Sequence, residues 1–250
     1  MCQAVNGWVI AHPAAPPRCL VLGVTPEFAT MDWPEKTRLT AVDRNPAMIE
    51  KVWPGYPRPG EGAVCGDWFN LPLLDASVDI VLADGCFTLI NSLQSGELMH
   101  SVKRVLCNEG IMVFRCFARP QVKERPEAVM QDLLAGRIGS FHAFRWRLNM
   151  SLYDEDKKGV HLGGIWDYWH KTGLDNEGLA ERMSWPPESI ALIDFYRGMD
   201  TFYFYPTFDE LRAIFDPHFS EVACYIPTYE LGERCPIFVL RQNSTFKNRG

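Results

Sequence analysis

The chain has 250 residues, and 47% of them are hydrophobic, which is enough to build the core of a globular protein. Its formal charge of -6 argues against nucleic-acid binding, which depends on a basic excess. No run of about 18 apolar residues occurs, and the N-terminus lacks a basic region before a long apolar stretch. We therefore expect a cytoplasmic protein that has no membrane partner and no nucleic-acid partner.

The cysteines and histidines show no pattern of metal ligands. The eight cysteines form no CxxC pair, and the six histidines lack ligand spacing. We interpret the cysteines as small buried residues in a reducing compartment, and we expect no metal site. The candidates for a general base are His142, His161, His170 and the tyrosines of the insertion, although a packed or surface role is the simpler interpretation of each histidine.

Apolar runs alternate with helical patterns through the first half of the chain. Strands are predicted over residues 19–24, 38–43, 62–67, 78–84 and 110–117. A helix is predicted over residues 45–53, where Asn45 is the N-cap and Pro46 takes the first helical position, and another over 95–106. Continuous apolar strands separated by helices predict a parallel sheet that is covered on both faces.

The second half has a different character. From about residue 119 to 205 it is rich in aromatic and charged residues without strand alternation, which predicts a helical insertion or lid. A helix capped by Thr207 or Asp209 follows, and then two strands over 221–227 and 235–242 that we expect to form an antiparallel hairpin. The predicted domains are therefore residues 1–118 with 206–250, and an insertion of residues 119–205.

A doubly wound sheet binds ligands at the carboxyl ends of its strands. The residues that follow the predicted strands are Gly23 to Glu27, Asp43 and Arg44, Asp67 and Trp68, and Asp84 to Phe87. Asp43 can accept hydrogen bonds from both hydroxyls of a ribose, because its two oxygens match a vicinal diol. That arrangement suits NAD and S-adenosylmethionine equally, and a surface or helix-capping role for Asp43 is the alternative.

The stretch GDWFNLPLLDASVDIVLADG, from Gly66 to Gly85, resembles the class I S-adenosylmethionine-dependent methyltransferases. The segments AVDRNPAMIEKV and VKRVLCNEGIMVF are similar to the family's regions after its second strand and before its fifth. The resemblance spans about residues 19–117. It implies an α/β fold, namely a Rossmann-like, doubly wound, mostly parallel seven-stranded sheet with an antiparallel C-terminal hairpin, and S-adenosylmethionine as cofactor.

The resemblance also implies roles for residues around an adenine ring. Asp67 would accept a hydrogen bond from the adenine amino group, Trp68 would cover or edge the ring, and Met48 would pack on its other face. Arg44, beside Asp43, is counted with these cofactor-binding residues. The alternatives are that Trp68 anchors its loop to the core and that Met48 is an ordinary core residue.

The turn LGVTPE, from Leu22 to Glu27, departs from the family's first motif. Val21, Thr25 and Glu27 occupy positions where the family has an acidic residue and two further glycines, so only Gly23 remains. We expect Thr25 to cap the next helix and, with the amides beyond Pro26, to receive the methionine carboxylate. Glu27 would repel that carboxylate unless it faces away or holds the methionine ammonium; otherwise it marks a site that has lost the cofactor.

Residues at the end of the fourth strand lie where the family places the methionine moiety. Asp84 could hold the ammonium group, and Gly85 would let the acceptor come near. A nucleophilic role for Cys86 is open on position alone, but no sequence neighbour would lower its pKa.

The aromatic residues of the insertion either line a pocket for a small, partly apolar acceptor or form the insertion's own core or a dimer interface. The leading hypothesis is a methyltransferase that acts on a small molecule. A homodimer is compatible with this function. The alternative is a non-catalytic methyltransferase-like binding protein. An NAD-linked oxidoreductase is disfavoured, because the dinucleotide glycine fingerprint is absent.

Overall fold

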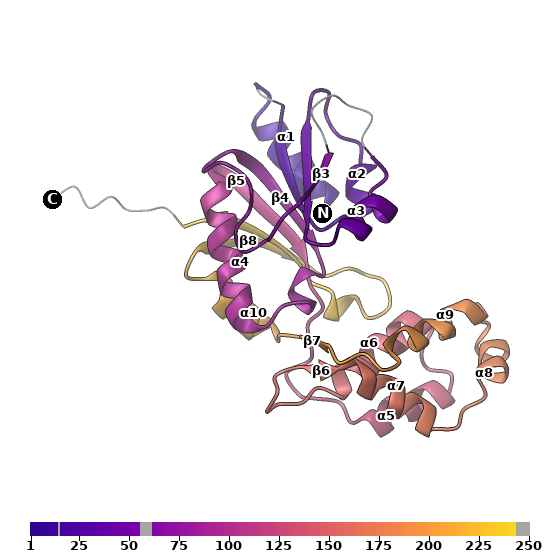
Figure 1. Ribbon diagram of the computed structural model, residues 1–250. Coiled ribbons are helices and arrows are strands. Elements are labelled where there is room, and N and C mark those ends of the chain that lie inside the picture. Colours follow the sequence, from indigo (N-terminus) through magenta and orange to yellow (C-terminus); the bar gives the residue numbers. More distant parts are fainter. Residues whose placement is uncertain (15, 56–61, 244–250) are drawn as a thin grey trace.

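The computed structural model describes residues 1–14, 16–55 and 62–243 (Figure 1). Its main feature is a seven-stranded sheet in the order β3-β2-β1-β4-β5-β9-β8. The strands are β1 (Arg18–Leu22), β2 (Arg38–Asp43), β3 (Gly62–Cys65), β4 (Val78–Asp84), β5 (Leu106–Arg115), β8 (Phe219–Tyr225) and β9 (Ile237–Gln242). The predicted fold class is confirmed.

The central strands are parallel, and the two C-terminal strands are reversed. β1 pairs in parallel with β2 on one side and with β4 on the other, so the strand order reverses between β1 and β4. β9 runs antiparallel to β5 and to β8, which confirms the predicted hairpin. The carboxyl ends of β1, β2 and β4 therefore meet at the switch point of the sheet.

Helices cover both faces of the sheet, and each face has its own apolar core. One core contains residues of α1 (Cys2–Ala11) and α2 (Pro26–Ala29), with side chains of α3 (Pro46–Val52) packed at its margin. The other contains residues of α4 (Ser92–Val105) and α10 (Phe208–Phe215), and a short 3-10 helix, η1 (Cys86–Thr88), follows β4 on this side. This arrangement follows from strands that are apolar on both faces.

Local capping fixes where several of these helices begin. The Asn45 side chain accepts a hydrogen bond from the Ala47 amide, and Pro46 is the first helical residue, as predicted. Thr207, rather than Asp209, caps α10, because its hydroxyl accepts from Glu210 while the Glu210 carboxylate accepts from the Thr207 amide. This reciprocal capping box satisfies amides that the first turn leaves without partners.

The insertion folds as a group of helices with its own core, and Figure 1 shows it beside the sheet. It contains α5 (Pro126–Leu134), α6 (Phe141–Ser151), α7 (Leu162–Lys171), α8 (Asn176–Met183), α9 (Pro187–Ala191) and the 3-10 helix η2 (Leu192–Tyr196). A short antiparallel pair, β6 (Val160–His161) with β7 (Phe202–Tyr203), was not predicted. The helical insertion of the predicted fold is confirmed, while its exact boundaries as a domain stay a prediction.

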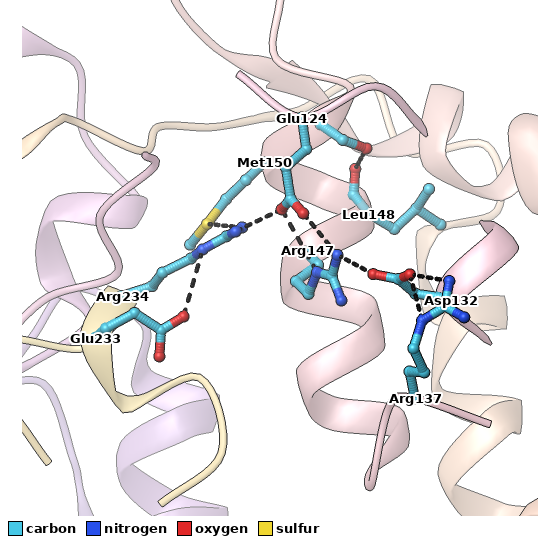
Figure 2. Close-up of polar contacts among 9 residues, drawn as sticks. Glu124, Asp132, Arg137, Arg147, Leu148, Met150, Glu233 and Arg234 are labelled. Carbon is cyan, nitrogen blue, oxygen red and sulfur yellow. Dashed lines mark hydrogen bonds and ion pairs between the residues drawn. The ribbon is translucent and has the colours of Figure 1, made fainter. Parts of the chain in front are cut away.

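A chain of ion pairs ties the insertion to the loop between β8 and β9 (Figure 2). Arg234, in the 3-10 helix η3 (Gly232–Arg234), contacts Glu124, and Glu124 also pairs with Arg147 of α6 at 2.6 Å. Arg147 also forms an ion pair with Asp132 of α5 at 2.7 Å. Because Glu124 bridges an arginine from each side, it helps to hold the insertion against the sheet.

The pH dependence of stability should report this bridge. Burial alone raises the pKa of Glu124, but hydrogen bonds from Arg147 and Arg234 outweigh it and lower the pKa below 4.5. A carboxyl group whose pKa is lower in the folded protein than in the unfolded protein stabilises the fold at pH values above its unfolded pKa. This stabilisation is lost as the pH falls through the folded pKa. Thermal melts of wild type and Glu124→Gln should therefore differ at pH 7, and the difference should shrink as the pH is lowered below 4.5. A difference that stays constant over this range would contradict the bridge.

Several predicted bounds need correction. β1 ends at Leu22 and β3 at Cys65, two residues earlier than predicted in each case, because the chain turns there to form the loops at the carboxyl edge. β5 begins at Leu106, directly after α4, and ends at Arg115. The helix α1 was not predicted at all, although Val5 and Trp8 bury its inner face against the sheet.

Candidate functional site

A cavity of about 240 Å³ lies at the carboxyl ends of β2 and β3. It brings together several residues predicted to bind cofactor: Asp43, Arg44, Met48, Asp67 and Trp68. Asn45, Phe69, Leu89 and Ile90 complete its lining. The cavity therefore combines carboxylates with apolar and aromatic surfaces, which is the composition expected for a nucleoside pocket.

Asp43 is held at the mouth of β2 by a short turn. Its Oδ1 accepts a hydrogen bond from the Asn45 amide at 2.8 Å, so the carboxylate orients the start of α3. Its Oδ2 points towards the turn after β1, 3.9 Å from the position that a Cβ on Gly23 would occupy. Asp43 thus has a structural role at the start of α3, and its contact with a ribose stays a prediction.

Trp68 packs across the switch point. Its indole Nε1 donates to the Val42 carbonyl at 2.7 Å, and the same carbonyl accepts from the Gly23 amide at 2.9 Å. A Cβ on Gly23 would lie 3.7 Å from the indole, and Gly23 has φ of +90°. Only glycine adopts this conformation readily, which explains why this glycine stands in an otherwise altered turn. Trp68 therefore both anchors its loop and lines the cavity.

The turn beyond Gly23 differs from the prediction. Thr25 occupies the N-cap position of α2 and Pro26 the first helical position, but the Thr25 side chain makes no cap hydrogen bond. The helix is only four residues long, so it offers a single turn of oriented amides. The predicted Thr25 cap is wrong, and a contact between Thr25 and the methionine carboxylate stays a prediction.

A second cavity, of about 790 Å³, lies at the carboxyl ends of β4 and β5. Its charged lining consists of Glu27, Asp84 and Arg115, and its aromatic lining includes Tyr225 and Tyr229 from the end of β8 and the loop after it. Glu27 therefore lines the same cavity as Asp84. This placement leaves an ammonium-binding role open for Glu27.

Asp84 is engaged by an arginine. Arg115 donates to both of its carboxylate oxygens, at 2.7 and 2.6 Å, and to the Tyr229 hydroxyl at 3.2 Å. Burial lowers the pKa of Arg115, but the hydrogen bonds and charge of Asp84 more than compensate and raise it. Arg115 therefore stays cationic and fixes the Asp84 carboxylate. The predicted contact of Asp84 with an ammonium group would have to be made alongside this pair.

Gly85 adopts φ of +68° and lies against an aromatic ring. A Cβ at this position would be 3.0 Å from Cε2 of Phe117, which stacks on Trp146 of α6 at a centroid distance of 4.0 Å. The insertion thus supplies a ring that meets the end of β4 through Phe117. Access of an acceptor to Gly85 itself stays a prediction.

Cys86 is not built to be a nucleophile. It is buried, and burial together with the charge of Asp84 raises its pKa to about 12. At pH 8 only about one thiol in ten thousand would be a thiolate. Native-state alkylation with iodoacetamide should therefore modify the exposed Cys2 and Cys65 while leaving Cys86 intact, as read by peptide mass spectrometry. Rapid modification of Cys86 would show that this region opens.

Two of the histidines named as candidate bases have structural contacts. His161 accepts a hydrogen bond from the Gly164 amide at the start of α7 and lies 3.1 Å from Asp200. His170 stacks on Trp166 at 3.9 Å. His142 is on α6, and burial followed by the charge of Arg145 lowers its pKa. None of the three lines either cavity described above.

The insertion's aromatic residues serve mainly as its core. Most of those predicted as pocket candidates belong to its apolar cluster: Trp146, Tyr153, Trp166, Tyr168, Trp169, Trp185, Tyr196, Tyr203 and Tyr205. Phe195 is instead 69% exposed. Tyr153, Phe204 and Tyr205 also line a 630 Å³ cavity between the insertion, α4 and α10, and their role as an acceptor pocket stays a prediction.

Within residues 1–14, 16–55 and 62–243, no group of three histidine, cysteine or acidic side chains is placed to hold a metal ion. In the same residues, no helix has the length and apolar character that crossing a membrane requires.

Comparison with known proteins agrees with the geometry. The family described as methyltransferase domain matches residues 20–114. No curated protein matches the chain. Among solved structures, a protein from Pyrococcus horikoshii has a TM-score of 0.57 at 12% identity, covering 96% of this chain and 89% of that one.

Two further structures carry descriptions of activity. A S-adenosylmethionine-dependent methyltransferase from Methanosarcina mazei has a TM-score of 0.53 at 14% identity, covering 93% of this chain and 96% of that one. The 1,6-didemethyltoxoflavin-N1-methyltransferase of Burkholderia thailandensis, solved with 1,6-didemethyltoxoflavin and S-adenosylhomocysteine, has a TM-score of 0.51 at 15% identity, covering 96% and 77%. At these identities the likeness concerns the fold.

Proposed function

We propose that the chain, whose residues 20–114 match the methyltransferase domain family, transfers a methyl group from S-adenosylmethionine to a small-molecule acceptor. The observation that supports this most directly is the convergence of Asp43, Met48, Asp67 and Trp68 on one cavity at the switch point of the sheet. Residues from separate loops meet there, as a nucleoside site requires.

The lining of this cavity fits the adenosine part of the cofactor. The Asp67 carboxylate suits an exocyclic amine, Trp68 and Met48 offer apolar surface, and Asp43 suits a ribose diol. A phosphate-binding nest is not needed, because S-adenosylmethionine has no phosphate, and the single glycine at Gly23 allows close approach.

The methionine part would extend past Gly23 towards the second cavity. Glu27 and Asp84 present carboxylates there, which suit the positively charged ammonium and sulfonium groups. Arg115 balances one of these carboxylates and offers a cation for the methionine carboxylate or the acceptor. The atypical turn therefore fits a ligand end that carries both signs of charge.

The chain's own residues would act mainly by alignment. S-adenosylmethionine supplies an already activated methyl group, so the protein needs to position the acceptor in line and exclude water. The insertion of residues 119–205 would form the acceptor side, since Phe117 and Trp146 join it to the end of β4. Well-aligned reactants can lower the barrier by about 7 kcal/mol or more.

Calorimetry tests the cofactor directly. We expect S-adenosylmethionine and S-adenosylhomocysteine to bind with micromolar affinity and NAD to show no binding, because the site has carboxylates for an adenosine and no nest for a pyrophosphate. Release of S-adenosylhomocysteine over a panel of small metabolites then measures turnover. Binding of NAD without a response to S-adenosylmethionine would overturn the proposal.

One observation supports the alternative, a non-catalytic methyltransferase-like binding protein. Glu27 lines a cavity with Asp84 and stands at a position where the family has a glycine, so a second carboxylate would adjoin the methionine part of the cofactor. Tight cofactor binding without turnover of any panel member would favour a binding protein. We further propose cytoplasmic residence, because the eight cysteines form no CxxC pair and several fall inside apolar, strand-like runs. We also propose that neither nucleic acid nor membrane is a partner, and a homodimer stays a prediction.

A further inference from the structure

Arg145, on α6, is a partly buried cation without a carboxylate partner among the described residues. The other arginines of the insertion that are not exposed are paired: Arg119 with Glu210 at 2.9 Å, and Arg147 with Glu124 at 2.6 Å. The Nε of Arg145 is fully buried and has no hydrogen-bond partner in the described part of the chain. A half-buried guanidinium without a counterion is costly unless a ligand supplies one.

The surroundings of Arg145 are aromatic and rich in hydrogen-bond donors. Its guanidinium lies over the Trp146 ring at 5.4 Å and acts electrostatically on the phenols of Tyr203 and Tyr205. Burial, reinforced by Tyr196, raises the pKa of Tyr203, so its hydroxyl stays protonated and can donate. The cluster thus presents one cation and neutral donors, which is the chemistry of an anion receptor.

A second unsatisfied group lies in the same cluster. Asn149, also on α6, is completely buried and donates to the Tyr205 hydroxyl at 3.1 Å, while its Oδ1 has no donor among the described residues. Buried amide oxygens without partners are rare in folded proteins. The missing partner of this oxygen must be a hydrogen-bond donor, which a carboxylate is not, so Oδ1 does not itself indicate an anion.

The cluster is connected to the proposed site of methyl transfer. Trp146 stacks on Phe117, and Phe117 lies against Gly85 at the end of β4. The Phe204 amide, between the two tyrosines, donates to the Thr88 carbonyl in η1 at 2.9 Å. A molecule held at Arg145 would therefore be attached to the elements that frame the end of β4.

We propose that Arg145 binds a carboxylate of the methyl acceptor, so that the substrate class is small organic acids. This inference rests on the proposed function for the role of the ligand as acceptor. A carboxylate matches the planar fork of arginine with two parallel hydrogen bonds. A carboxylate also carries one negative charge, which matches the one positive charge of Arg145, the cation that acts on the phenols of Tyr203 and Tyr205.

Binding of matched acid and amide pairs to the full chain tests the proposal. The probes are acetate, benzoate and 3-phenylpropanoate, each against its amide, with inorganic phosphate as the competing anion, measured by ligand-observed NMR. We expect at least one acid to bind about tenfold more tightly than its amide, because charge-assisted hydrogen bonds distinguish them. Arg145→Gln should abolish the preference, and Arg145→Lys should retain part of it.

Arg197→Gln is the matched control, since Arg197 also lies over a tryptophan, Trp166 at 5.3 Å, but is exposed. It should leave the preference unchanged. The proposal is overturned if no acid is preferred in wild type, if Arg145→Gln keeps the preference, or if phosphate binds more tightly than every acid. Calorimetry of S-adenosylmethionine on the same variants separates the two proposals. Acid binding without cofactor binding would overturn the methyltransferase proposal alone. Cofactor binding without a preference for acids would overturn the Arg145 proposal alone.

Discussion

Replacement of Asp43 with alanine is expected to reduce the affinity for S-adenosylmethionine by at least about tenfold. The substitution removes charge-assisted hydrogen bonds to the ribose hydroxyls, each worth roughly 1.5 to 3 kcal/mol, and about 1.4 kcal/mol corresponds to a factor of ten. Stability should fall by about 1 kcal/mol or less, since the folded protein loses only the bond from the Asn45 amide to Oδ1. Calorimetry and thermal melts with and without cofactor measure the two effects separately.

Two controls separate the ribose contact from the local turn. Asp43→Asn keeps an oxygen that can accept from the Asn45 amide, so it should melt like wild type and still bind cofactor more weakly. Asp75→Ala removes the same charge from an exposed loop, where Asp75 pairs with Arg104, and should leave cofactor binding unchanged. An Asp43→Ala protein that melts much lower yet binds cofactor normally would make Asp43 a structural residue only.

Much of the sheet could be predicted because its central strands are apolar on both faces. The bounds of β2 and β4 agree with the predicted 38–43 and 78–84, since each strand ends at an aspartate where the chain reaches solvent. The end of β1 was placed too late because Val24 continues the apolar run. Val24 is indeed buried, but it packs in the core beyond a turn at Gly23.

The elements that were missed depend on contacts that local sequence does not show. The helix α1 carries a glycine at position 7, and Trp8 anchors it by donating from Nε1 to the Glu109 carbonyl at 2.8 Å. The short pair of β6 and β7 joins residues about 40 positions apart in sequence, Val160 with Tyr203. Tertiary packing rather than propensity stabilises such short elements.

The residues of the candidate site likewise include some that the sequence could predict and some that it could not. Asp43, Asp67 and Asp84 could be found because each follows a predicted strand, and parallel strands bring their carboxyl ends together. Arg115 also ends a strand, and a charged residue after the apolar run 110–114 was a usable signal. Tyr229 gave no such signal, because it reaches Arg115 from the loop between β8 and β9.

Gly232→Ala should be strongly destabilising. A Cβ at this position would lie 2.0 Å from the Pro227 carbonyl oxygen and 2.7 Å from its carbon, and both are backbone atoms that cannot rotate away. Overpacking of this kind typically costs about 1 to 3 kcal/mol, and each kcal/mol lowers the melting temperature by about 2 to 4 °C in a chain of this size. Gly96→Ala is the matched control, because Gly96 lies within α4 with nothing within 4 Å, so alanine there should stabilise by about 0.5 to 1 kcal/mol.

The same substitution should loosen the insertion, because the turn at Gly232 positions two of its attachments. Glu230 accepts hydrogen bonds from the Gly139 amide at 2.6 Å and from the Ser140 hydroxyl at 3.0 Å, and Arg234 contacts Glu124. If the backbone from Pro227 to Gly232 shifts to admit a methyl group, both attachments weaken together. Hydrogen exchange should then quicken at the Gly139 amide in Gly232→Ala and stay at the wild-type rate in Gly96→Ala. Unchanged protection of Gly139 in a destabilised Gly232→Ala protein would show that the turn stabilises the sheet without holding the insertion.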